Sequence, residues 1–115
     1  MPSAAPEVET GARTLSAQTE ITEQFLDDII EFSGDAERLS AGLREAGVTQ
    51  DLPCIFHGIA EDARDRVADF RQPIPPRNAK PFQLRVLLDD AILIAPMAAA
   101  AAADRAAEQQ QVATN

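Results

Sequence analysis

The strongest constraint on the fold is a pair of amphipathic helix patterns that follow one another between residues 35 and 71. The first pattern ends at Gly47, a residue that readily takes the left-handed conformation found just after many helices. Val48 is then placed to contact Leu43, as in a Schellman motif. Pro53 suits the first turn of the next helix, where its missing N–H has no cost. Together these features predict a helical hairpin.

The apolar positions of these patterns recur at the three- and four-residue spacing of an α-helix. Asp35 and Asp51 are placed to cap the two helices. The first helix is predicted to bury Ala36, Leu39, Leu43 and Ala46. The second is predicted to bury Leu52, Phe56, Ile59, Ala63, Val67 and Phe70. Another amphipathic helix is expected from about Thr19 to Phe32, and Gly34 is predicted to end it.

Composition divides the rest of the chain around this core. Residues 1–15 are rich in Pro, Ala, Glu and Thr and are predicted to form a disordered tail. Residues 16–72 form the predicted helical core, and residues 73–81 form a proline-rich link. An apolar and then alanine-rich segment follows at 82–108. Residues 109–115 are expected to be a second disordered tail.

The segment 82–95 fits two secondary structures. Phe82, Leu84, Val86 and Leu88 alternate as in a strand, which would make Asp89-Asp90 the turn of a β-hairpin. A helical stripe fits equally well. The helix is favoured because three helices precede it and an isolated two-stranded hairpin is marginally stable. Pro96 is expected to break or kink whichever structure forms.

The net charge of −9 and the pI of about 4.4 limit the partners. Nucleic acids and anionic membranes are bound by clustered Lys and Arg, whereas the basic residues here are scattered. The hydrophobic content of 45% is to a large extent alanine, which buries little area. The core is therefore lean, and a protein partner or a second copy could complete it.

Three observations predict a cytoplasmic protein without a membrane span. A single cysteine cannot form an internal disulfide. The N-terminus lacks the basic and apolar regions of a signal peptide. The longest uncharged apolar stretch, Ala91–Ala103, has 13 residues, and a spanning helix needs roughly 20.

Cys54, His57 and Glu61 are the candidate chemical groups, since their spacing places them roughly on one helix face. All three side-chain types bind metals, but a closed site needs a fourth ligand and the chain has no second Cys or His. A Cys–His nucleophile would need an orienting group and an oxyanion feature, and neither is recognisable. We therefore expect no metal, no cofactor and no catalytic activity.

A lone histidine on a helix of a small acidic bundle resembles the layout of histidine phosphotransfer domains. His57 would be the phosphoacceptor that this resemblance implies, with the small residues Gly58 and Ala60 beside it. The lysine that usually follows in such domains is absent. Glu61 and Asp62 stand there instead and would repel a phosphoryl group.

The sequence therefore predicts an all-α fold, a small up-down bundle of three amphipathic helices, a proline-rich link and a fourth helix. The predicted function is a non-enzymatic assembly or adaptor subunit acting through helix–helix interactions, and phosphotransfer by His57 is the alternative. The expected partner is another protein or a second copy. The predicted association surface is the apolar stripe Leu84, Leu87, Leu88, Ala91, Ile92 and Ala95, with Phe82, Val86, Leu93 and Ile94 adding apolar area on other faces.

Overall fold

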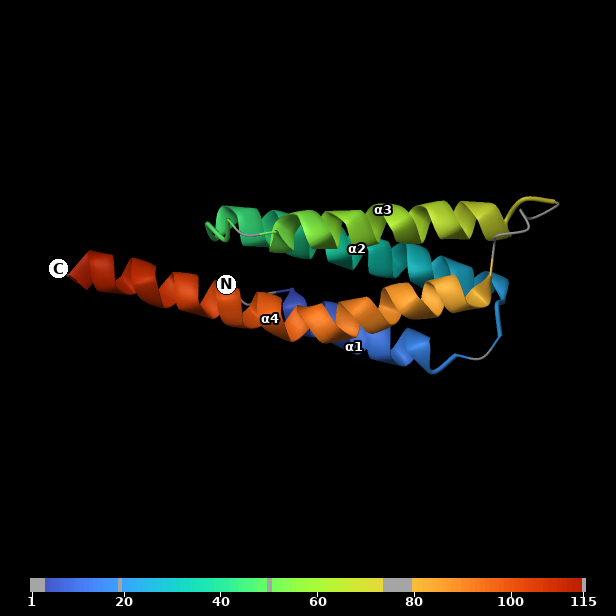
Figure 1. The fold of residues 1–115 in the computed structure, drawn as a ribbon, viewed down its shortest axis with the longest axis horizontal. Coiled ribbons are helices and arrows are strands. Elements are labelled where there is room, and N and C mark those ends of the chain that lie inside the picture. The colour runs from blue at the N-terminus through green and yellow to red at the C-terminus, as the bar shows by residue number, and fades with distance from the viewer. Residues whose placement is uncertain (1–3, 19, 50, 74–79, 115) are drawn as a thin grey trace.

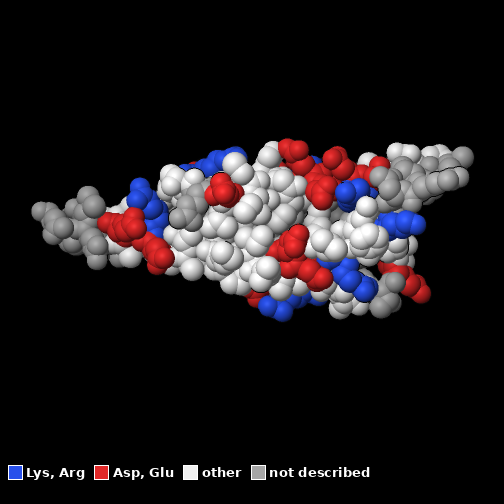
Figure 2. Space-filling model, viewed as in Figure 1, with Lys and Arg blue, Asp and Glu red and all other residues white. Residues whose placement is uncertain are grey.

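The computed structural model describes residues 4–18, 20–49, 51–73 and 80–114, without the side chains of residues 110–114. Within these ranges the chain contains helices and no strand, and it forms an elongated bundle of 61 × 21 × 18 Å (Figures 1 and 2). The predicted all-α fold is confirmed, and residues 82–95 are helical. The helices are α1 (Ala5–Ser16), α2 (Glu23–Glu45), α3 (Leu52–Phe70) and α4 (Pro81–Thr114).

The predicted hairpin is formed by α2 and α3. Gly47 has a φ of 81°, and its N–H donates to the carbonyl of Arg44 at 3.1 Å. The N–H of Val48 donates to the carbonyl of Leu43 at 2.9 Å, which completes the Schellman motif. The predicted cap at Asp51 is wrong, because its backbone is helical and its side chain makes no capping hydrogen bond.

Helix α2 runs without interruption through Gly34, so the predicted helix end there is wrong. The reason is that the apolar stripes before and after Gly34 are in phase: Phe25, Ile29, Phe32, Ala36, Leu39 and Leu43 are all buried. Burying this face outweighs the cost of about 1 kcal/mol for a glycine inside a helix. Asp35 lies in mid-helix and pairs with Arg38 instead of capping.

The predicted disorder of residues 1–15 is also wrong for the residues described. Helix α1 buries Ala5, Val8, Ala12 and Leu15 in a narrow seam and packs along the middle of α4 (Figure 1). Small side chains allow close approach, and the facing side of α4 carries Ala91, Ala95 and Ala98, each buried. A segment with so few apolar residues has the composition of a disordered chain. Its helix becomes evident only from its packing against α4.

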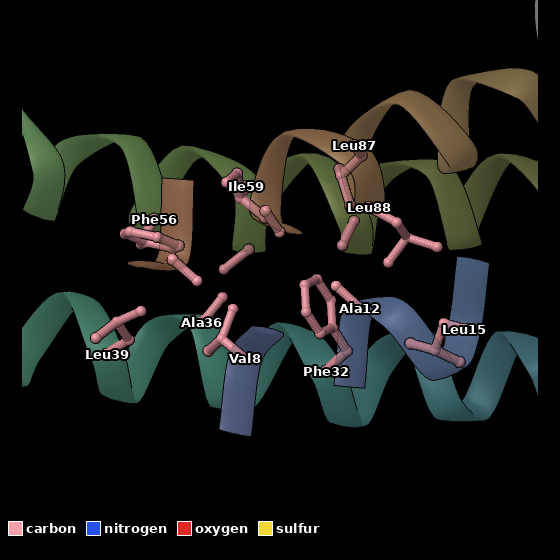
Figure 3. Packing of buried hydrophobic residues seen from close by; sticks show 14 of the residues in the cluster. Val8, Ala12, Leu15, Phe32, Ala36, Leu39, Phe56, Ile59, Leu87 and Leu88 are labelled. Atoms are coloured by element: carbon pink, nitrogen blue, oxygen red, sulfur yellow. The ribbon is translucent and has the colours of Figure 1, made fainter. Parts of the chain in front are cut away.

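Side chains from all four helices meet in one core (Figure 3). Phe32 and Leu39 of α2 point toward Phe56 and Ile59 of α3, and Leu87 and Leu88 enter from α4. Helix α4 continues past Pro96, whose ring is exposed while Ala95 and Ala98 are buried on either side of it. Of the two outcomes expected at Pro96, a break or a kink, the break does not occur, and residues 109–114 are assigned to the helix instead of a disordered tail. Residues 74–79, most of the predicted link, lie outside the described residues.

The first testable prediction concerns α1. Val8→Asp should lower the free energy of unfolding by more than about 3 kcal/mol, because it places an unpaired charge at a fully buried position. Thr10→Asp, on the exposed side of the same helix, should change it by less than about 0.5 kcal/mol. Urea denaturation measures both. Equal midpoints for the two variants would show that α1 does not pack as described.

Candidate interaction surface

Helix α4 is apolar on two opposite faces. Its inner face, formed by Leu84, Leu87, Leu88, Ala91, Ala95 and Ala98, is buried in the bundle. Its outer face carries four large apolar side chains: Phe82 (62% exposed), Val86 (50%), Leu93 (71%) and Met97 (59%). At 3.6 residues per turn these four lie within about 60° of one another, and about 160° from the centre of the inner face. We call these four residues the outer stripe.

A groove of about 360 Å³ lies between α3 and α4, beside the outer stripe. The groove is open where it passes Gly58, because a Cβ added to that residue would meet nothing within 4 Å. Its α3 wall consists of Ile55, Gly58, Ile59, Asp62 and Arg66. Its α4 wall consists of Phe82, Gln83, Val86, Leu87 and Asp90. The groove therefore combines an apolar interior with a few charged and amide groups, as binding sites commonly do.

Arg66 lines this groove and carries an unmatched donor. Its Nε is buried and, among the described residues, has no hydrogen-bond partner. Oδ1 of Asp62, one helical turn earlier, lies 3.8 Å away, which is within ion-pair range but too long for a hydrogen bond. Arg66 therefore contributes a charged group to the groove wall, while its Nε is not accessible from the groove.

A second hollow, of about 570 Å³, lies between the α2–α3 turn and the C-terminal part of α4. Arg105 packs against the turn, where a Cβ on Gly47 would come within 2.9 Å of its Nε. Met97 lines this hollow, whereas Phe82 and Val86 line the groove. The outer stripe thus joins the two depressions. On the face of the molecule that carries α3 and α4, an uncharged central area is surrounded by both acidic and basic groups (Figure 2).

The predicted association surface is on the wrong face of α4. Leu84, Leu87, Leu88, Ala91 and Ala95 are buried in the core of the single chain, and Ile92 is half-buried. The error follows from α1, which covers this face and was predicted to be disordered. Of the residues predicted to add apolar area elsewhere, Phe82, Val86 and Leu93 are exposed and Ile94 is half-buried. Met97 was missed, although its spacing of four from Leu93 continues the stripe.

His57 lies between two carboxylates and joins α3 to α2. Its Nδ1 is 2.7 Å from Oε1 of Glu37, its Nε2 contacts Glu61, and Arg64 is 3.5 Å from the same Glu37 oxygen. A carboxylate therefore stands beside each ring nitrogen, and these negative charges would repel a phosphoryl group approaching either one. No sequence pattern indicates Glu37, because it lies 20 residues away on another helix.

The predicted metal donors are placed as follows. Cys54 is exposed at the start of α3, whereas His57 is half-buried and Glu61 is exposed. Within the described part of the chain, no three His, Cys, Asp or Glu side chains are arranged to hold one metal ion.

One described helix could cross a membrane by length and composition alone. It comprises the 29 residues Pro81–Gln109 of α4, in which an 18-residue window reaches a mean hydropathy of 1.8. We expected no membrane span because the uncharged stretch Ala91–Ala103 is too short. A segment that includes two charged residues is longer and reaches the length of a spanning helix. A single such helix is weak evidence, because a long helix in a protein core meets the same criteria.

Comparison with known proteins adds no relative. No family model, curated protein or solved structure matches the chain.

The two faces of α4 should respond differently to charge. Leu87→Lys should lower the free energy of unfolding by more than about 3 kcal/mol, because it charges the core. Leu93→Lys, with its side chain already in solvent, should change it by less than about 1 kcal/mol in dilute solution. Urea denaturation at submicromolar protein tests both. Comparable losses from the two substitutions would mean that the faces have been assigned wrongly.

Proposed function

We propose that this protein is a non-enzymatic assembly or adaptor subunit that binds protein through the outer stripe and the adjoining α3/α4 groove. The observation that carries the proposal is the set of four large apolar side chains on one helix face, each at least half exposed. Large apolar side chains aligned on one exposed helix face commonly mark an interaction site. They adjoin a groove that Ile55, Ile59 and Leu87 line together with polar groups, so an incoming side chain finds a place to be buried.

The position of the stripe favours binding without a large ordering cost. Its residues stand on a helix whose opposite face is anchored in the core by Leu84, Leu87 and Leu88. A surface that is already rigid loses little conformational entropy when a partner docks. An apolar helix face lying in a groove is also a recurrent mode of protein recognition.

Protein is favoured over lipid as the neighbour of α4. Asp89 and Asp90 stand in the middle of its apolar part, and each aspartate at the centre of a spanning helix costs about 2.5–3.5 kcal/mol. Insertion would also remove the inner face of α4 from α1 and α3. The arrangement around His57 favours a structural link between α2 and α3 over phosphotransfer, because both ring nitrogens face carboxylates.

Site-specific photo-crosslinking tests this function. A photoreactive residue replacing Leu93 should give discrete protein adducts when the full chain is irradiated in its own cells, and mass spectrometry identifies the crosslinked peptide. The same residue replacing Asp65, exposed on α3, is the control and should give none. A folded Leu93 variant that forms no protein adduct would contradict the proposal.

A further inference from the structure

We infer that the partner fitting the outer stripe is a second copy of this chain, docked with the two α4 helices antiparallel. This inference rests on the proposed function and names its partner. Three observations carry it: the symmetry of the stripe, the fit between its protruding half and the groove, and the area available.

The spacing of the outer stripe is the same read in either direction. Four residues separate Phe82 from Val86, seven separate Val86 from Leu93, and four separate Leu93 from Met97. An antiparallel pair with its two-fold axis between Asp89 and Asp90 therefore places Phe82 opposite Met97 of the other copy. It also places Val86 opposite Leu93. A patch that meets itself in this way is what a two-fold interface requires.

The same register brings the protruding side chains over the groove. Phe82 and Val86 form part of the groove wall, whereas Leu93 and Met97 lie outside it on the exposed helix. The two-fold axis sets Leu93 and Met97 of each copy above the groove of the other. The two side chains together bring eight non-hydrogen atoms, and the groove of about 360 Å³ has room for them.

The area suits a reversible dimer. The overlap of the two α4 helices, from about residue 81 to 98, is about 26 Å long at 1.5 Å per residue. Helices α3 and α4 side by side are about 20 Å wide, with each about 10 Å across. The contact is then on the order of 500 Å² per copy and 1,000 Å² in total. That reaches the lower limit for a specific interface, so dimerisation should depend on concentration in the micromolar range.

The effect of charge on the dissociation constant distinguishes this antiparallel dimer from binding to a basic partner. Asp89 and Asp90 flank the stripe at its centre, and the two-fold axis brings each near the other copy's carboxylates. Like charges weaken the contact, so neutralising them should strengthen it. If the partner were instead a basic helix, the same change would weaken binding, because the carboxylates would be its counter-charges.

Disulfide trapping tests the register directly. In a Cys54→Ser background, Val86→Cys and Leu93→Cys proteins mixed together should form a mixed disulfide dimer under mild oxidation. Each variant alone should not, because equivalent positions are offset by seven residues, about 10.5 Å along the helix, and a disulfide needs Cα atoms within about 7 Å. Crosslinking of either variant with itself, or none in the mixture, would overturn the antiparallel register.

Sedimentation velocity on the purified full chain tests the partner. The wild-type protein should shift from monomer to dimer with concentration, and Leu93→Lys should remain a monomer. Asp89→Asn with Asp90→Asn should lower the dissociation constant roughly three- to tenfold. A monomer at every concentration overturns the second copy as partner. If the chain is monomeric but the photoreactive residue at position 93 crosslinks to a protein of another mass, the proposed function still holds. If position 93 gives no protein adduct, both the dimer and the proposed function are wrong.

Discussion

The fold depends on the inner face of α4, which the neighbouring helices cover and which gives the core three of its leucines. The inner face of α4 supplies Leu84, Leu87 and Leu88 to a core that contains few large side chains. Helix α1 covers the alanine part of that face, and α3 approaches from the other side. Once these contacts are made, the bundle has no further helix to place on the outer stripe. The described helices therefore leave the stripe exposed, and we propose that a separate molecule covers it.

The elements that sequence predicted well are those set by local interactions. The turn at Gly47 and Val48 depends on residues within one helical turn, and it forms as expected. Elements set by distant contacts were missed. Helix α1 could not be recognised because Val8 and Leu15 gain their stability from α4, far along the chain. The continuity of α2 could have been recognised, because the spacing from Phe32 to Ala36 keeps the stripe in phase across Gly34.

The candidate interaction surface was likewise predicted only where local sequence determines it. Sequence predicted that α4 would be apolar on more than one face, and it is. It did not predict which face the rest of the chain would cover, since that choice depends on α1. The groove and the unmatched donor on Arg66 arise where α3 and α4 lie side by side, so only the tertiary structure shows them. The contact between Glu37 and His57 likewise depends on the register of α2 against α3.

The most direct test of the account is the thermal unfolding midpoint measured over a wide range of protein concentration. Any contact made only in the folded state raises the midpoint as the concentration of the partner rises. If copies cover the outer stripe for one another, the midpoint of the wild-type chain should rise with concentration. The midpoint of the Leu93→Lys variant should stay constant, and the midpoints of the two proteins should become equal on dilution. A wild-type midpoint that does not change with concentration would contradict the account, because the outer stripe would then be stable without a cover.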